Sequence, residues 1–209
     1  MSPKPRATRT LERDAWALGF VDIAGVDEVG RGCLAGPVTA AAVVLPHEIR
    51  IPGIKDSKVL TAEEREALFG QITRVALRWH VASVDPLEID RINIHQASLL
   101  AMRRAVEALM PLPGFVLVDG FRIPHLVIAQ RPVVGGDRRS TAIAAASILA
   151  KVTRDKFMVA AHAEDPRYGF DRHKGYATAD HLKAVAEFGY SVLHRRSFRP
   201  PSLFDTILG

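Results

Sequence analysis

The stretch of sequence that decides the fold is Ile23-Ala24-Gly25-Val26-Asp27-Glu28-Val29-Gly30-Arg31-Gly32. Its apolar composition predicts a strand over residues 21–29. The glycines at its end predict a tight turn over residues 30–32, because glycine readily adopts a positive φ. The Val- and Ala-rich run at residues 38–45 predicts a second strand. We therefore expect the chain to begin its sheet with two neighbouring strands joined as in a β-hairpin.

Strand and helix patterns alternate over the rest of the chain. A capping box, Thr61-Ala62-Glu63-Glu64, predicts the start of a helix with an apolar stripe. Further helices are expected at residues 93–109, 140–161 and 179–188, and strands at residues 78–84, 114–119 and 125–129. This alternation predicts an α/β fold, with a mixed sheet that is antiparallel at its start and parallel later and is flanked by helices. Small side chains at Ala142 and at residues 144–147 would let one helix approach the sheet closely.

Composition is typical of one globular domain. The chain has 209 residues, 48% apolar and 24% charged, which suits a single domain over residues 19–209 that follows a flexible basic tail over residues 1–18. Cys33 is the only cysteine, so a disulfide within the chain is impossible and a cytoplasmic location is expected. The longest apolar runs, residues 38–45 and 142–150, are about half the ~20 residues of a membrane-spanning helix. We therefore expect no membrane association. No feature of the sequence calls for an oligomer, so we also expect a monomer.

The charge balance favours a polyanionic partner. Lys and Arg number 28 against 23 Asp and Glu, a formal net charge of +5. Residues 172–199 hold six Lys or Arg and only two acids, which fits either a solvated basic face or contact with phosphates. Tyr168 and Tyr176 could stack on a sugar or base, although packing is the ordinary role of a tyrosine. The eight histidines show no metal-ligand spacing and are expected on the surface.

Carboxylates in or at the end of two apolar strands are the main chemical signal. Asp27 and Glu28 follow Ile23-Ala24-Gly25-Val26, and Asp119 follows Phe115-Val116-Leu117-Val118. Two carboxylates ~4 Å apart repel by about 4 kcal/mol at an effective dielectric constant near 20, and burial adds a desolvation penalty. A shared proton, an arginine or a divalent cation could compensate them. Oxygen ligands favour Mg²⁺ or Mn²⁺ over Zn²⁺, and Mg²⁺ often completes its shell with substrate phosphate, which points to a phosphate ester as substrate.

Two more acids and the glycine turn have competing interpretations. Asp137 lies in a glycine loop before a predicted helix and either joins the other carboxylates or acts as a loop or capping acid. Asp155 lies four residues after Lys151, which is typical of an ion pair on a helix face. Gly30-Arg31-Gly32 partly matches a dinucleotide-binding fingerprint, but no predicted helix follows it and two acids precede it. Its backbone donors could instead approach a sugar-phosphate, where a 2′-hydroxyl distinguishes RNA from DNA.

The glycine turn and the carboxylate motifs described above resemble those of the ribonuclease HII family, the type 2 ribonucleases H. Residues 27–32, Asp-Glu-Val-Gly-Arg-Gly, resemble the family's Asp-Glu-Ala-Gly-Arg-Gly motif, with Val29 where alanine is usual. The other similar blocks are Asp56-Ser57-Lys58, Ile89-Asp90-x-x-Asn93-Ile94, Val118-Asp119-Gly120, Gly136-Asp137, residues 145–155 and His173-Lys174-Gly175-Tyr176. Arg31 favours ribonuclease HII over the related ribonuclease HIII, which lacks an arginine there.

The resemblance implies a ribonuclease H-like catalytic domain with a C-terminal helical extension. The catalytic carboxylates, which would bind Mn²⁺ or Mg²⁺, are Asp27, Glu28, Asp119 and Asp137. The substrate-binding residues would be Gly30, Arg31 and Gly32 at the ribose, Tyr176 on the following sugar and Lys58 at a phosphate. The implied reaction is two-metal hydrolysis of the RNA strand of RNA/DNA hybrids and cleavage 5′ to single ribonucleotides in duplex DNA. It would leave 5′-phosphate and 3′-hydroxyl ends.

Two other classes of protein compete with this expectation. A non-catalytic nucleic-acid-binding module would use the basic surface and keep the acids as structural groups. It would bind hybrids equally well with and without EDTA. A nicotinamide-dependent oxidoreductase would instead bind NAD saturably at the glycine turn.

Overall fold

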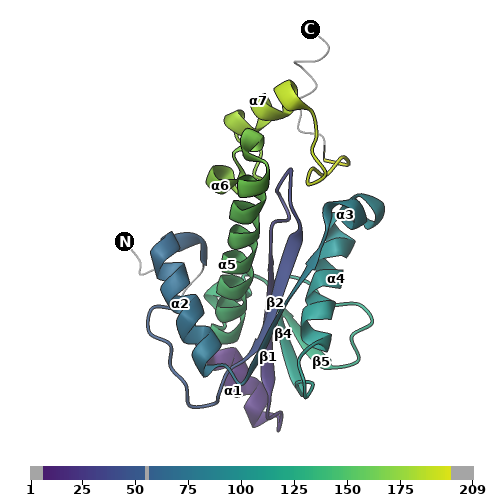
Figure 1. Cartoon of the computed structure of the whole chain (residues 1–209). Helices are drawn as coiled ribbons and strands as arrows, with labels where there is room; N and C mark the ends of the chain where they lie inside the picture. Colours follow the sequence, from purple (N-terminus) through teal and green to yellow (C-terminus); the bar gives the residue numbers. More distant parts are fainter. Residues whose placement is uncertain (1–6, 55–56, 199–209) are drawn as a thin grey trace.

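A mixed five-stranded sheet forms the centre of the computed structural model, which describes residues 7–54 and 57–198 (Figure 1). The strands are β1 (Ile23–Val29), β2 (Val38–Val44), β3 (Arg78–Val84), β4 (Phe115–Asp119) and β5 (Ala129–Val133). Their spatial order is β3-β2-β1-β4-β5. The β1–β2 and β2–β3 pairs are antiparallel, and the β1–β4 and β4–β5 pairs are parallel. The predicted mixed sheet is therefore confirmed, and the strand that follows the glycine turn excludes a dinucleotide-binding βαβ unit there.

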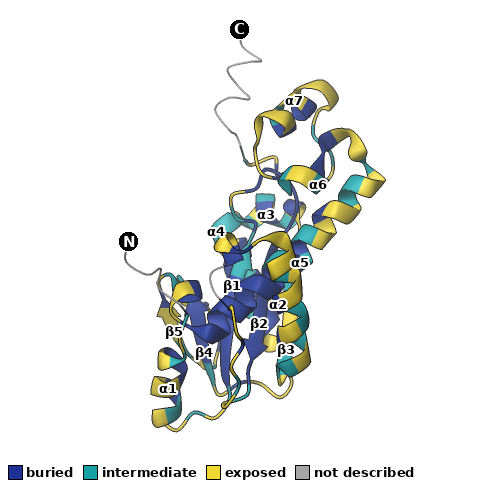
Figure 2. Cartoon of the chain, turned by 90° about the vertical axis from the view of Figure 1, so that its left-hand side faces the viewer, coloured by how far each residue is buried: buried dark blue, intermediate teal, exposed yellow. Residues whose placement is uncertain are grey.

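Helices cover both faces of the sheet (Figure 1). One face packs against α2 (Ala62–Val75) and α5 (Thr141–Glu164), and the other packs against α3 (Pro86–Ile92) and α4 (Ile94–Glu107). The helix α5 continues past the sheet and carries α6 (Phe170–His173) and α7 (Ala179–Phe188) beyond it (Figure 2). These two helices are the expected C-terminal helical extension. Among the described residues, no helix is both long and apolar enough to cross a bilayer.

The predicted close approach of α5 to the sheet is confirmed. A Cβ atom placed on Gly25 of β1 would lie 2.1 Å from the carbonyl carbon of Ala142 in α5. The alanines and Ser147 along this part of α5 are buried, and they bring the helix backbone against β1 and β2. Because side chains alternate between the two faces of a strand, Asp27 lies on the same face of β1 as Gly25. The small residues therefore bring α5 against the face that carries Asp27.

The strand predicted at residues 125–129 lies later in the chain, as β5 at Ala129–Val133. His125 has a φ of 60°, which interrupts an extended conformation. Before it, both backbone groups of Ile123 bond to the side chain of Gln130 instead of to a strand. Pro132 argues against a strand in the sequence, but β5 is at the edge of the sheet, where proline is tolerated.

The prediction of a flexible tail over residues 1–18 is wrong for residues 7–18, the part that the structure describes. Thr10–Ala17 form the helix α1, whose Leu11 and Ala15 pack into the core. Glu12 is 1% exposed and accepts hydrogen bonds from the Ser140 hydroxyl at 2.7 Å and the backbone N–H of Ala142 at 2.8 Å. This carboxylate thereby satisfies free donors at the start of α5, which is why the segment is held in place. Residues 1–6 lie outside the described residues.

The histidines were also predicted to lie on the surface, and this prediction is wrong for two of them. His181 and His194 are buried in the C-terminal extension, where their imidazole nitrogens Nε2 lie 3.0 Å apart. Arg195, within the segment interpreted as a basic face, is buried as well. Tyr168 is 2% exposed and stacks on Phe170, so packing is its role. An aromatic cluster thus forms the core of the extension.

Candidate active site

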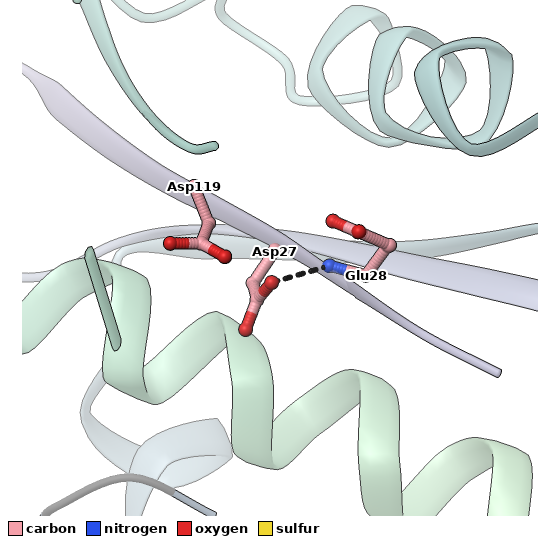
Figure 3. Close-up of side chains that lie close together, drawn as sticks. All are labelled: Asp27, Glu28 and Asp119. Atoms are coloured by element: carbon pink, nitrogen blue, oxygen red, sulfur yellow. Dashed lines mark hydrogen bonds between the residues drawn. The ribbon is translucent and has the colours of Figure 1, made fainter. Parts of the chain in front are cut away.

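Two parallel strands bring three carboxylates together at their carboxyl ends. Val26 of β1 pairs with Val118 of β4, so Asp27 and Asp119 emerge side by side. Asp27, Glu28 and Asp119 each offer an oxygen, and the three oxygens lie within 4.8 Å of one another. Figure 3 shows Asp27 pointing toward α5 and Glu28 pointing to the opposite side of β1. The fold therefore brings Asp27 and Asp119 together, although they are about 90 positions apart in the chain.

Asp27 is the most buried of the three, with 5% of its surface exposed. Its Oδ1 accepts a hydrogen bond from the backbone N–H of Glu28 at 2.7 Å, and Ser147 of α5 also bonds to the carboxylate. Burial, followed by the charges of Glu28 and Asp119, raises the pKa of Asp27 well above its ordinary value. The ionised site is therefore unfavourable without a compensating cation.

Glu28 has one partnered and one unpartnered oxygen. Its Oε1 lies 3.1 Å from Nη1 of Arg31, so the arginine of the glycine turn reaches back toward the carboxylates. Its Oε2 is buried and has no hydrogen-bond partner among the described residues. Burial raises the pKa of Glu28, and the hydrogen bond from Arg31 partly offsets that rise.

Asp119 is held by the loop that carries Asp137. The backbone N–H of Gly136 donates to Oδ1 of Asp119 at 2.6 Å. Burial raises the pKa of Asp119, and the charge of Asp137 raises it further. The residue after Gly136 is thereby placed next to the group of three.

Asp137 borders the group without belonging to the set that lies within 4.8 Å. It stands in the 3-10 turn η2 (Gly136–Arg138) and is 4% exposed. Its Oδ2 lies 3.5 Å from Nζ of Lys58, which reaches it from the turn η1 (Ser57–Val59). The Lys58 side chain is 80% exposed, so it is also open to solvent at the edge of the site. Asp56, which precedes this turn, lies outside the described residues.

The donor set fits a divalent cation. Three carboxylates supply hard oxygen ligands, and neither His nor Cys belongs to the group. The unpartnered Oε2 of Glu28 is a buried acceptor, and leaving such a group unsatisfied is costly. A cation among the carboxylates would satisfy this oxygen and offset the repulsion that raises the pKa of Asp27. The chemistry of these residues therefore fits a site for a divalent cation.

The glycine turn and Tyr176 lie beyond the carboxylates. Gly30 has a φ of 92°, and an added Cβ atom would lie 2.3 Å from Nε of Arg154, so only glycine fits. A Cβ atom on Gly32 would meet nothing within 4 Å, which leaves its backbone open to close approach. Tyr176 is 42% exposed, and its hydroxyl interacts with the thiol of Cys33, directly after the turn.

Asp155 stays outside the carboxylate group. Its Oδ1 accepts a hydrogen bond from Nζ of Lys151 at 2.7 Å, as predicted from their spacing on α5. Three supporting groups were not predicted from the sequence: the Ser147 hydroxyl, the Gly136 N–H and the buried Arg154, whose guanidinium donates to the carbonyl oxygens of Ala35 and Pro37 after the glycine turn. The signal for Ser147 is a lone hydroxyl among alanines on a buried helix face. The backbone N–H of Gly136 has no signal in the sequence, because its partner is set by loop geometry.

The sequence and fold were compared with known proteins. Residues 24–200 match the family profile described as Ribonuclease HII. The Ribonuclease HII of Ralstonia pickettii (strain 12J) is 56% identical over 181 residues, which cover 85% of this chain and 78% of the relative. The ribonuclease H2 of Pyrococcus horikoshii OT3 has a TM-score of 0.73 at 24% identity, covering 88% of this chain and 96% of that one.

A second solved structure, Bst-RNase HIII in complex with Mn²⁺, has a TM-score of 0.66 at 21% identity and covers 93% of this chain and 71% of that one. Likeness at this level shows the ribonuclease H-like fold, as the resemblance implied. The match to the family profile covers most of the chain, and the identity to the relative is high. The chain belongs to the ribonuclease HII family and is a ribonuclease H enzyme.

Proposed function

We propose that this enzyme cleaves the RNA strand of RNA/DNA hybrids and nicks duplex DNA on the 5′ side of an embedded ribonucleotide. The observation that carries the proposal is the group of Asp27, Glu28 and Asp119, three carboxylates within 4.8 Å at the ends of two parallel strands. Oxygen-rich groups of this kind hold divalent cations that bind substrate phosphate. Phosphodiester hydrolysis at this group agrees with the ribonuclease H activity of the family.

We assign the binding of two divalent ions, Mn²⁺ or Mg²⁺, to Asp27, Glu28, Asp119 and Asp137. The complex of Bst-RNase HIII with Mn²⁺ supports such binding in this fold. When bound, two ions of this kind activate the attacking water and stabilise the leaving 3′ oxygen. The expected products carry 5′-phosphate and 3′-hydroxyl ends.

Residues around the carboxylates position the substrate in this proposal. The open backbone at Gly32 lets N–H groups of the turn approach a 2′-hydroxyl, the group that distinguishes RNA from DNA. Arg31, held beside Glu28, keeps a positive charge at the same place. The exposed ring of Tyr176 stacks on the next sugar, and the exposed Lys58 contacts a phosphate.

The proposed enzyme acts as a single chain in the cytoplasm. All four carboxylates of the proposed site come from one chain, so catalysis needs no second subunit. Cys33, the only cysteine, is a buried free thiol, which suits a reducing compartment. Light scattering on a sizing column measures the molar mass of the purified protein, alone and with substrate. We expect the mass of one chain, about 22.9 kDa, for the protein alone.

A labelled DNA duplex with one ribonucleotide, compared with its all-deoxy twin, tests the proposed reaction. With Mg²⁺ or Mn²⁺ we expect one cut on the 5′ side of the ribonucleotide, no cut in the twin, and no cut in either duplex when EDTA is added. Equal cutting of both duplexes would contradict recognition of the ribose. An intact ribonucleotide duplex under every divalent ion would contradict the proposed reaction itself.

A further inference from the structure

A short segment near the end of the described chain, residues 194–197, joins separate parts of the molecule, and we call it the clasp. It belongs to the yellow loop that follows α7 in Figure 1. The backbone N–H of Arg195 donates to the carbonyl oxygen of Leu34 at 2.9 Å, just after the glycine turn. The carboxylate of Asp90 in α3 accepts hydrogen bonds from the next two backbone N–H groups, at 2.8 and 2.9 Å. The clasp is therefore anchored on both the glycine-turn segment and α3.

The side chain of Arg195 donates hydrogen bonds to backbone carbonyls of the glycine turn and of the residues after it. It is 0% exposed, its Nε donates to the carbonyl oxygen of Gly36 at 2.9 Å, and its Nη1 donates to the carbonyl oxygen of Arg31 at 3.0 Å. No carboxylate among the described residues forms an ion pair with it. Burial lowers the pKa of Arg195 to about 10, so the guanidinium is still charged at neutral pH. A buried cation is thus held by backbone carbonyls that belong to the turn and the residues after it.

The neighbouring side chain, His194, holds Tyr176, the proposed contact to the following sugar, through a relay of hydrogen bonds. Its Nδ1 accepts from the backbone N–H of Ser191 at 2.9 Å, so its proton lies on Nε2. That Nε2–H donates to Nε2 of His181 at 3.0 Å. The remaining N–H of His181, at Nδ1, donates to the backbone carbonyl of Tyr176 at 2.8 Å. Two adjacent residues of the clasp therefore hold Tyr176 and the glycine turn.

We infer that His194 and Arg195 are positioning residues that set the placement of Tyr176 relative to the turn at residues 30–32, and that preference for a ribose depends on the Arg195 guanidinium. The inference rests on the proposed function, because it concerns the contacts proposed there to the ribose and to the following sugar. A peptide unit is planar and trans, so the bond to the Arg31 carbonyl directs the N–H of Gly32 to the opposite side, away from Arg195. Hydrogen bonds weaken steeply when misaligned, and a turn flanked by glycines does not fix this direction by itself.

The first test replaces Arg195 by lysine, which keeps the positive charge but cannot hold two carbonyls with one planar group. The matched control is Arg167→Lys, in the same extension, where the arginine binds both oxygens of the nearby Asp165 at 2.8 Å. The readout is the ratio of the dissociation constants of the all-deoxy duplex and the single-ribonucleotide duplex, with Ca²⁺ in place of Mn²⁺ to prevent cleavage. A general loss of structure would weaken both complexes equally, whereas a positioning role changes the ratio.

We expect Arg195→Lys to lower this ratio about tenfold, through weaker binding of the ribonucleotide duplex alone, and Arg167→Lys to keep the wild-type ratio. An unchanged ratio in Arg195→Lys, or an equal loss in both variants, overturns the inference. If the wild-type protein itself does not prefer the ribonucleotide duplex, the proposed function is wrong. That result is distinguishable from a failure of the inference about the clasp, in which the wild type prefers the ribonucleotide duplex and Arg195→Lys keeps the same ratio.

A second variant keeps the inference testable if Arg195→Lys does not fold. Asp90→Ala removes the anchor of the clasp on α3 and leaves the Arg195 side chain intact. We expect faster hydrogen exchange at the Arg195 amide and a smaller loss of ribose preference than in Arg195→Lys. Faster exchange at that amide with a wild-type ratio overturns the inference.

Discussion

Gly25 and Ala142 are in direct backbone contact, since a methyl group on Gly25 would lie 2.1 Å from the carbonyl carbon of Ala142. Residues 25 and 27 share one face of β1, so this contact sets how closely α5 approaches Asp27. Ser147, one and a half turns further along α5, then reaches the Asp27 carboxylate. Packing at a glycine thus controls the surroundings of the most buried acid in the site.

Replacing Gly25 by alanine is expected to destabilise the protein by about 2 kcal/mol or more, because backbone atoms of α5 must move. The matched control is Gly70→Ala in α2, where an added Cβ atom meets nothing within 4 Å. That change should stabilise the protein by up to about 1 kcal/mol, since alanine favours a helix. Urea unfolding of both variants measures the difference. Equal stabilities would show that α5 does not approach β1 this closely.

Asp119→Asn is expected to remove most Mn²⁺ binding and to reduce cleavage of the ribonucleotide duplex by about a hundredfold or more. The acid contributes one of three clustered oxygens, and an amide is a much weaker ligand. Isothermal titration with Mn²⁺ and single-turnover cleavage measure the two effects. Asp165→Asn, in the C-terminal extension, serves as the control and should bind Mn²⁺ as the wild type does. Normal Mn²⁺ affinity in Asp119→Asn would exclude it as a ligand.

Asp27→Asn should stabilise the metal-free protein at pH 8. The folded-state pKa of Asp27 is raised, so its ionisation costs more in the folded than in the unfolded state, and stability is lost as pH rises through the folded-state pKa. Asparagine removes that cost. Mn²⁺ at a hundred times its dissociation constant should stabilise the wild type by about 2.7 kcal/mol and this variant much less. Thermal unfolding with EDTA and with Mn²⁺ measures both, and a variant less stable than wild type in EDTA would refute the prediction.

Stability should fall as the pH drops from about 6.5 toward 4, because of His181 and His194. Burial lowers their pKa values to about 4 and about 3, so the unfolded chain binds protons that the folded chain does not. Each histidine contributes a slope of up to about 1.4 kcal/mol per pH unit. The charge of His173, stacked 4.3 Å from His181, lowers both pKa values further, whereas the charge of Asp165 raises the pKa of His194.

Unfolding by urea at several pH values, for wild type and His194→Gln, measures the contribution of His194. The variant should show the shallower slope between pH 6 and pH 4.5. The carboxylates of the proposed active site, whose pKa values are raised, act in the opposite direction, but they are present in both proteins and cancel in the difference. Parallel curves would show that His194 takes up its proton equally in the folded and unfolded chains.

Tyr176→Ala is expected to raise KM for the ribonucleotide duplex about tenfold, a loss at the lower end of the ~1–3 kcal/mol that stacking of an aromatic ring on a base contributes. Tyr176→Phe keeps the ring and should stay within about threefold of wild type, although it removes the hydroxyl that interacts with Cys33. Steady-state cleavage of the same duplex measures both variants. A large loss in Tyr176→Phe and Tyr176→Ala alike would assign the role to the hydroxyl and not to the ring.

Much of the fold follows from local patterns in the chain. The capping box at Thr61 begins α2 as predicted, and the predicted ranges for β3 and α7 match the structure. The carboxylates Asp27 and Asp119 were identifiable because an acid in an apolar strand is unfavourable unless something compensates it. These are short-range or compositional signals, and neighbouring residues are enough to produce them.

Contacts between distant segments carry no such local signal. Glu12 lies in a segment that the sequence predicts to be a flexible tail, and only its contact with the start of α5 shows its role. His181, His194 and Arg195 likewise lie in a segment predicted to be at the surface, although the folded extension buries them. The convergence of three carboxylates within 4.8 Å likewise depends on which strands pair. Local composition therefore specifies the elements and the acids they carry. Strand pairing and packing over long separations specify which of those residues meet, because burial and hydrogen bonding depend on neighbours in space.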